Sequence, residues 1–180
     1  MIILEHSDYM DYFKNMMSLF YFAGVSEEKI PPMSFNQFLD TCTDIPTLHK
    51  CRNLIVKKPK LTPEFLKLNR HLLAPGDVKI IKDFARRRTS RFIVVRYEAD
   101  YAVFVDSKDT KIYAVKALTE PFSAIFPDLP VCIEATIMPF KNVIVYDGFA
   151  HVSTSKIGMK EELIQSCDEQ IKKVGIIKSF

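Results

Sequence analysis

Several signals that mark common protein classes are missing from this sequence of 180 residues. Its five glycines are isolated from one another, which excludes the dinucleotide-binding fingerprint, the P-loop and the nucleophile elbow of hydrolases. The longest apolar runs stop well short of the roughly 20 residues that span a bilayer. The first residues also lack the basic region and the cleavage site of a signal peptide, so we expect a cytoplasmic protein without a membrane partner.

Cysteine is sparse as well. The four cysteines are widely spaced and form no Cys-x-x-Cys pair, as is usual for reduced cysteines that serve as small buried apolar residues. Cys42, His49 and Cys51 form the densest group of metal-ligating residue types, but their spacing matches no zinc signature, and the fourth ligand would have to be a distant residue such as His71. We therefore expect neither a metal ion nor another cofactor.

Charge is arranged in blocks along the chain, although the net charge is only +3. Residues 1–49 hold two basic and seven acidic residues, residues 50–91 hold 13 basic and three acidic residues, and residues 92–180 hold 10 and 12. A strongly basic segment thus lies between two acidic flanks. Two clusters dominate it and supply the candidate polyanion-binding residues: Lys57, Lys58, Lys60, Arg86, Arg87, Arg88 and Arg91.

Cations at this density are costly to bury, so we expect them at the surface, where they create a positive field. Such a surface is typical of contact with a nucleic acid, RNA or DNA, or with an acidic protein surface. An intramolecular role, in which carboxylates of the same chain pair with these cations, stays open as the simpler interpretation. No helix-turn-helix, zinc-finger or ribonucleoprotein motif accompanies the charge.

The N-terminal region, residues 1–75, has the apolar spacing of helices. A first helix is expected from Ser7 or Asp8 to about Phe22, with Gly24 as its stop. Apolar residues cover more than half of its circumference, which indicates burial on several sides or a homodimer interface. Three further helices are expected within residues 35–42, 44–61 and 62–73, the last with Thr62 as its N-cap.

From residue 76 onward the apolar period changes to two, which predicts strands. Strands are expected at 78–84, 91–97, 101–106, 111–118, 131–138 and 142–147, with 149–153 as a further strand or a continuation. A short helix at 119–126 and a closing helix at 159–174 complete the pattern. The sequence therefore predicts an α+β protein, with a helical region over residues 1–75 and an antiparallel domain over residues 76–180. That domain would be a five- to six-stranded sheet or small barrel with a C-terminal helix.

One block of the sequence is distinctive: IYAVKALTEPFSAIFPDLPVCIEATIMPFKNVIVYDGF, residues 112–149. It combines a Thr-x-x-Phe helix, a Leu-Pro-Val strand start and a Pro-Phe-x-x-x-Ile-x-Tyr-Asp-Gly hairpin. This block resembles a family of uncharacterised bacterial proteins, some of which carry a C-terminal SEC-C metal-binding tail. The resemblance implies a small β-rich module and no activity. The tail requires a Cys-x-Cys pair that this sequence lacks, so the resemblance implies no metal site.

These observations favour a non-enzymatic binding protein, bacterial or from a phage, that contacts a polyanion or an acidic protein through segment 57–91. One alternative is an interaction module that forms a homodimer through its N-terminal helix and has no role with nucleic acid. A second alternative is a metal-dependent nuclease, for which Asp106, Glu134 and Asp147 are the carboxylates on or near strands.

Overall fold

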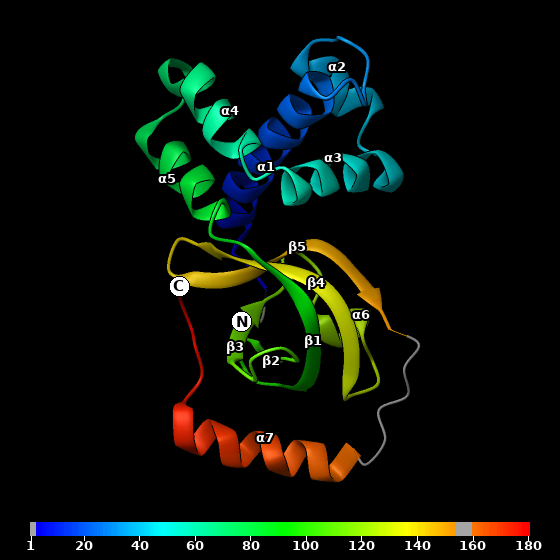
Figure 1. The fold of residues 1–180 in the computed structure, drawn as a ribbon, viewed down its shortest axis with the longest axis vertical. Helices are drawn as coiled ribbons and strands as arrows, with labels where there is room; N and C mark the ends of the chain where they lie inside the picture. Colours follow the sequence, from blue (N-terminus) through cyan, green and yellow to red (C-terminus); the bar gives the residue numbers. More distant parts are fainter. Residues whose placement is uncertain (1–2, 154–159) are drawn as a thin grey trace. The chain divides into compact units, whose positions relative to one another are not determined.

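The computed structural model describes residues 3–153 and 160–180 and divides the chain into two compact units. Met10–Ala85 form a helical unit, and Met1–Tyr9 together with Arg86–Phe180 form a barrel unit (Figure 1). The sequence predicts a boundary near residue 75 instead, because residues 78–84 have an alternation that suggests a strand. Over the described ranges, no helix combines the length and the hydropathy that a bilayer span requires.

The helical unit contains five α-helices and one short 3-10 helix among its described residues. They are α1 (His6–Ser26, which begins in the barrel unit), α2 (Phe35–Thr41), α3 (Ile45–Lys57), α4 (Leu61–Asn69), η1 (Arg70–Leu72) and α5 (Pro75–Phe84). The helices expected before residue 75 are thus confirmed. Ser34 caps α2 as part of a capping box, since its hydroxyl accepts from the Gln37 backbone N–H at 3.3 Å and the Gln37 side chain accepts from the Ser34 N–H at 2.8 Å.

The predicted strand at 78–84 is wrong, because this segment forms α5. Val78, Ile81 and Phe84 are all buried, and their spacing fits one face of a helix. In a strand, Lys82 would share the buried face with Val78 and Phe84, but its side chain is exposed. Pro75 occupies the first turn of α5, a position that favours helix initiation.

Two expected helix-end signals are also wrong. α1 continues through Gly24 to Ser26, and the glycine is needed there for close packing. A Cβ atom at Gly24 would lie 2.8 Å from Ile30 Cδ1 and 3.0 Å from Cys51 Sγ. Thr62 does not cap α4, which begins one residue earlier; it is fully buried, and its hydroxyl has no hydrogen-bond partner among the described residues.

The apolar face of α1 packs within the helical unit. Its buried side chains include Tyr12, Met16, Met17, Leu19 and Phe20. Burial by the chain's own helices accounts for the apolar composition of α1. The homodimer that this composition suggested stays a prediction.

Polar contacts to Asp77 join α1 to α5 inside this unit. The amide of the buried Asn15 donates to Asp77 at 2.9 Å, and Lys14 pairs with the same carboxylate at 2.9 Å. Burial raises the pKa of Asp77, but the hydrogen bonds from Asn15 and Lys14, the Lys14 charge and a backbone hydrogen bond at Ala74 together lower it more, so the net pKa lies below the ordinary value.

The barrel unit is built on five strands: β1 (Arg88–Tyr97), β2 (Ala102–Asp106), β3 (Ile112–Lys116), β4 (Val131–Phe140) and β5 (Val143–Val152). They close into a barrel in the order β1-β2-β3-β5-β4 (Figure 1). The predicted antiparallel meander β1-β2-β3 is confirmed. The expectation of a purely antiparallel sheet is wrong, since β3 and β5 pair in parallel. Residues 149–153 add no sixth strand, because β5 continues through them to Val152.

Alternation along the strands supplies the core of the barrel. Phe92 of β1 and Phe104 of β2 are fully buried, and their ring centroids lie 5.9 Å apart. Between β3 and β4 the predicted short helix forms as α6 (Phe122–Ile125). Its Phe122 ring lies 5.2 Å from Phe104 and 5.0 Å from Tyr146, so α6 anchors its loop to the same core.

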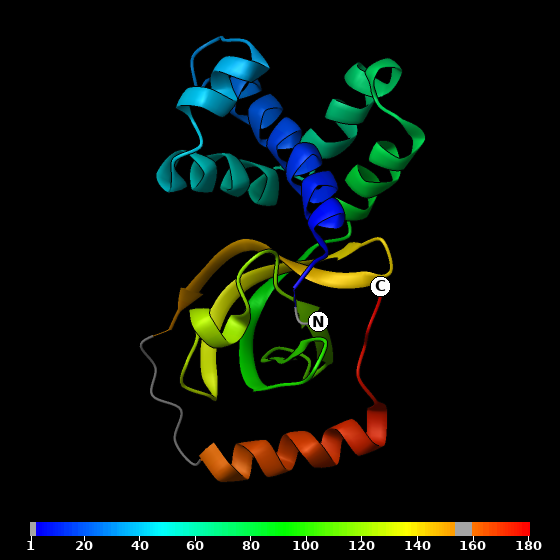
Figure 2. The same cartoon turned by 180° about the vertical axis from the view of Figure 1, so that it is seen from behind.

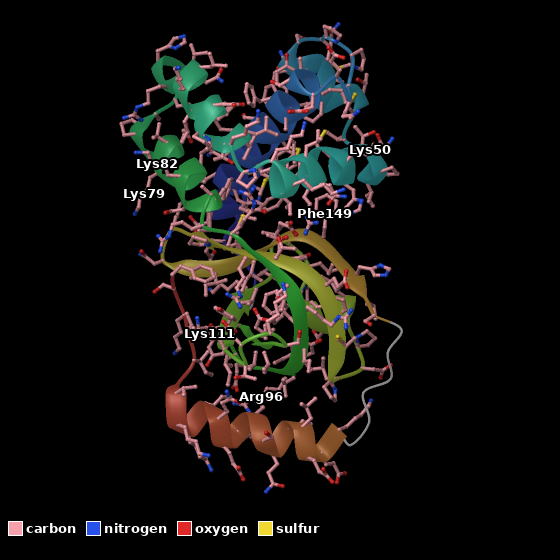
Figure 3. All side chains as sticks on the ribbon, viewed as in Figure 1. Lys50, Lys79, Lys82, Arg96, Lys111 and Phe149 are labelled. Carbon is pink, nitrogen blue, oxygen red and sulfur yellow. The ribbon has the colours of Figure 1, made fainter. Side chains whose placement is uncertain are left out.

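The closing helix α7 (Lys160–Val174) covers the outer side of β1, β2 and β3 (Figure 2). Cys167 packs with Val95, Val103 and Ile112 in a second apolar cluster. A β-bulge in β1 between Val94 and Arg96 changes the alternation, and Arg96 pairs with Asp168 of α7 (Figure 3). The predicted helix start at residue 159 lies outside the described residues.

Candidate functional site

The seven predicted polyanion-binding residues are divided between the two units. Lys57, Lys58 and Lys60 lie where α3 ends and α4 begins, in the helical unit, and Arg86, Arg87, Arg88 and Arg91 open the barrel unit. Other cations of the basic segment lie on two sides of the helical unit in Figure 3, where Lys50 projects from α3 and Lys79 and Lys82 project together from α5. The segment therefore presents at least two groups of cations.

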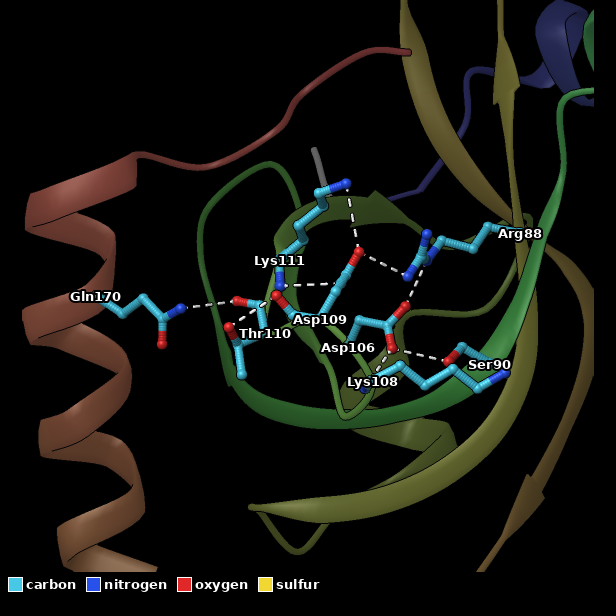
Figure 4. A network of polar contacts seen from close by, with 8 residues as sticks. All are labelled: Arg88, Ser90, Asp106, Lys108, Asp109, Thr110, Lys111 and Gln170. Atoms are coloured by element: carbon cyan, nitrogen blue, oxygen red, sulfur yellow. Dashed lines mark hydrogen bonds and ion pairs between the residues drawn. The ribbon is translucent and has the colours of Figure 1, made fainter.

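Arg88 is held inside the barrel unit by carboxylates of the same chain (Figure 4). Its guanidinium donates to Asp106, which is fully buried, and pairs with Asp109 at 2.9 Å. The guanidinium also lies 5.9 Å from the centre of the Tyr113 ring. The intramolecular interpretation thus holds for this arginine.

Further contacts complete the Asp106 site. The Ser90 hydroxyl donates to Asp106 at 2.8 Å, and the backbone N–H of Lys108 donates to the same oxygen at 2.9 Å. Asp106 therefore has charged and neutral donors for both carboxylate oxygens, as a buried charge requires. Burial lowers the pKa of Arg88, but the hydrogen bond to Asp106 and the nearby Tyr113, Asp106 and Asp109 together raise it more, so the guanidinium remains charged.

Strand alternation explains why Arg88 differs from Arg91. Arg88 and Ser90 share the inward face of β1 with Phe92, whereas Thr89 and Arg91 face outward. Arg91 pairs with Glu134 of β4 at 3.3 Å, and their side chains are 52% and 58% exposed. This exposed pair contributes little to stability, roughly 0–1 kcal/mol, so Arg91 remains available to a ligand.

The lysines of the helical unit stay at the surface. Lys58, the C-cap of α3, pairs with Glu27, and Lys60 lies 3.9 Å from Glu64 with a side chain that is 71% exposed. Lys57 is exposed in the last turn of α3, where a cation is favoured by the helix dipole. None of these contacts removes the lysines from solvent.

An open depression of about 390 Å³ lies beside β1, β4 and the turn after β2. We call it the β1–β4 cavity, and its lining residues are Thr89, Ser90, Arg91, Ser107, Lys108 and Glu134. Two cations and one carboxylate thus line one space, while the Ser90 hydroxyl is bonded to Asp106 and the Thr89 hydroxyl to Thr136. Arg91 is the predicted residue that lies in this lining.

The three carboxylates of the nuclease alternative are not assembled. Asp106 is bound to Arg88 inside the barrel unit, Glu134 pairs with Arg91 outside, and Asp147 accepts from the Phe149 backbone N–H at 3.1 Å. Within the described ranges, no three His, Cys, Asp or Glu residues are grouped so that they could hold a metal ion. Cys42, His49 and Cys51 are among the described residues, so they do not form such a metal-binding group either. Burial raises the pKa of the Cys51 thiol to about 11.

The β1–β4 cavity contains candidate residues that the sequence did not single out. Lys108 and Ser107 lie outside both basic clusters, and Thr89 lies between two arginines of the second cluster. The signal that locates them is the register of β1, because Arg91 is paired with Glu134 and Phe92 with Asp106, directly before the turn that carries Ser107 and Lys108. Register cannot be read from single residues, since a shift by one position exchanges the two faces of a strand.

Comparisons of this chain with protein-family models, with curated proteins and with solved structures gave no significant match. The resemblance of residues 112–149 to a bacterial family stays a prediction. The function therefore has to be inferred from the topology and the charges.

Proposed function

We propose that this chain is a non-enzymatic binding protein whose ligand is a single-stranded nucleic acid. The observation that carries the proposal is the barrel topology: strand order β1-β2-β3-β5-β4, parallel pairing of β3 with β5, and a helix between β3 and β4. This is the topology of the OB-fold, a five-stranded Greek-key barrel that commonly binds oligonucleotides or oligosaccharides. Because one fold serves many functions, the charge of the chain has to select among these ligands.

Charge favours the polyanion. The barrel is preceded by a segment with 13 basic and three acidic residues, and cations of this kind attract a phosphate backbone and release its counterions. We assign the contacts to Lys57, Lys58 and Lys60 in the helical unit and to Arg86, Arg87 and Arg91 in the barrel unit. Arg88 is left out of this set, because its guanidinium already neutralises the buried Asp106.

The proposed binding mode differs from the usual one in one respect. OB-folds commonly bind through the face of β2 and β3, whereas α7 covers that face here with an apolar cluster. We therefore place the ligand on exposed surfaces that carry cations and not beneath α7.

The test is fluorescence anisotropy with a labelled 20-nucleotide single strand and the matching duplex, at about 50 and 200 mM KCl. We expect micromolar or tighter binding of the single strand that weakens steeply with salt. Replacing Arg86 and Arg87 together with alanine should weaken binding of every sequence alike. If each arginine contacts one phosphate, the slope of log K against log salt should become shallower by about 1.4.

The matched control replaces Lys172 and Lys173, in the last turn of α7, with alanine and so removes the same charge outside the basic segment. It should leave the slope almost unchanged. Equal losses of affinity in the control and in the arginine variant would mean that binding depends on the net charge of the protein alone and not on the position of the arginines. No binding at the lower salt concentration would exclude the nucleic acid and leave an acidic protein as the partner to test.

A further inference from the structure

The β1–β4 cavity combines features of a site for one ribonucleotide unit. Its volume of about 390 Å³ lies within the range of small-ligand sites, and every residue that lines it is polar. The residues come from β1, from the turn after β2 and from β4, so the backbone of the barrel holds their relative positions. All of them belong to the barrel unit.

The two cations of the cavity are suited to a phosphate group. Among the described residues Lys108 makes no ion pair, although its backbone N–H is fixed by Asp106 (Figure 4). Arg91 is engaged by Glu134 alone among the ion pairs of the described chain, and that pair is exposed on both sides. A phosphate can therefore take the Arg91 guanidinium from Glu134 at small cost.

Glu134 gives the cavity its selectivity. Once Arg91 turns to a phosphate, the Glu134 carboxylate is an acceptor without a donor and lies beside a second negative charge. A hydroxyl group on the ligand restores a donor to it, and the ribose 2′-hydroxyl is the group that distinguishes RNA from DNA. Deoxyribose has no such donor, so in a complex with DNA the exposed Glu134 carboxylate would be bonded to water only.

We infer that the β1–β4 cavity binds a ribose-phosphate unit, with Arg91 and Lys108 on the phosphate and Glu134 on the 2′-hydroxyl, so that the protein prefers single-stranded RNA to DNA. This inference rests on the proposed function, because it names the class of nucleic acid. The inference also adds Glu134 to the proposed contact residues, although its negative charge alone would repel a polyanion.

The experiment measures the affinities of the wild-type chain for a labelled RNA and for a DNA of the same sequence. We expect RNA to bind about tenfold tighter, the effect of one hydrogen bond to a charged acceptor. Glu134→Ala should abolish the preference and bring the ratio of the two affinities close to one. Lys108→Ala should weaken RNA and DNA equally and leave the ratio unchanged.

The ratio of the RNA and DNA affinities distinguishes recognition of the 2′-hydroxyl from general electrostatic attraction. Removing a negative charge strengthens RNA and DNA binding alike, so it cannot alter the ratio. Asp128→Ala, which removes an exposed carboxylate outside the lining, is the control and should preserve the wild-type ratio. Glu134 is exposed, and a melting curve for each variant will show that the fold is retained.

Equal affinities of the wild-type chain for RNA and DNA would overturn the inference and leave the proposed function standing. A preference for RNA that survives Glu134→Ala would also overturn it, because the selectivity would then lie elsewhere. Absence of binding to either strand at low salt would overturn the proposed function and the inference together.

Discussion

Arg88 and Arg91 belong to one strand and to one cluster of the sequence, yet they meet opposite environments. The Arg88 side chain is 30% exposed and faces Asp106, which is 0% exposed. Replacing Arg88 leaves that carboxylate buried without its cation. We expect Arg88→Ala to lower the free energy of unfolding by roughly 2–4 kcal/mol, somewhat below the cost of breaking a fully buried pair. Equilibrium unfolding in urea measures the change.

Arg91→Ala is the matched control for this prediction. It removes the same side chain from the same strand, but its partner Glu134 is exposed, so the expected change is within about 1 kcal/mol. Equal losses of stability in the two variants would contradict the assignment of Arg88 to a buried ion pair. A loss of nucleic-acid affinity confined to the Arg91 variant would agree with the division of roles proposed for the two residues.

At the scale of the element, α1 depends on the absence of a side chain at Gly24. An alanine Cβ would meet Ile30 at 2.8 Å, in a contact that requires the core of the helical unit to shift. Such overpacking costs about 1–3 kcal/mol, and the better helix propensity of alanine offsets about 1 kcal/mol of it. We expect Gly24→Ala to lower the free energy of unfolding by roughly 1 kcal/mol.

Gly76→Ala gives the comparison for Gly24→Ala. Gly76 lies in the first turn of α5, and no other residue's atom comes within 4 Å of the position of an added Cβ. The substitution should leave stability unchanged or raise it by about 0.5–1 kcal/mol, because alanine restricts the unfolded chain. Stabilisation by both substitutions in a urea titration would contradict the close packing at Gly24.

The same elements indicate how far the sequence determines the fold. The capping box at Ser34 and the alternation of β1, β2 and β3 are local signals, and the corresponding elements form as predicted. The predictions of a helix stop at Gly24 and of a strand at residues 78–84 are wrong because these local patterns fit two structures equally well. Close approach of Ile30 and of the more distant Cys51 decides the first, and burial of Ile81 within the helical unit decides the second.

The candidate site also combines features with a local sequence signal and features that depend on long-range contacts. The sequence locates Arg91 and the other cations of the basic segment, because charge density is a property of composition, but it does not single out Lys108. It does not show which cations have partners, since Asp106 and Glu134 lie far from Arg88 and Arg91 in the sequence and meet them only through strand register. The parallel pairing of β3 with β5, which identifies the barrel topology, is likewise a long-range feature without a local signal.

At the scale of the whole molecule, each unit has a core of its own. The helical unit buries residues such as Phe20, Phe38 and Ile81, and the barrel unit buries Phe92 and Phe104. We therefore expect the two stability variants to act separately. In hydrogen–deuterium exchange, Gly24→Ala should lower protection in α2–α5 and spare β1–β5, and Arg88→Ala should do the reverse. Loss of protection in both units after either substitution would show that they unfold as one cooperative structure, and stability effects could then no longer be assigned to one unit.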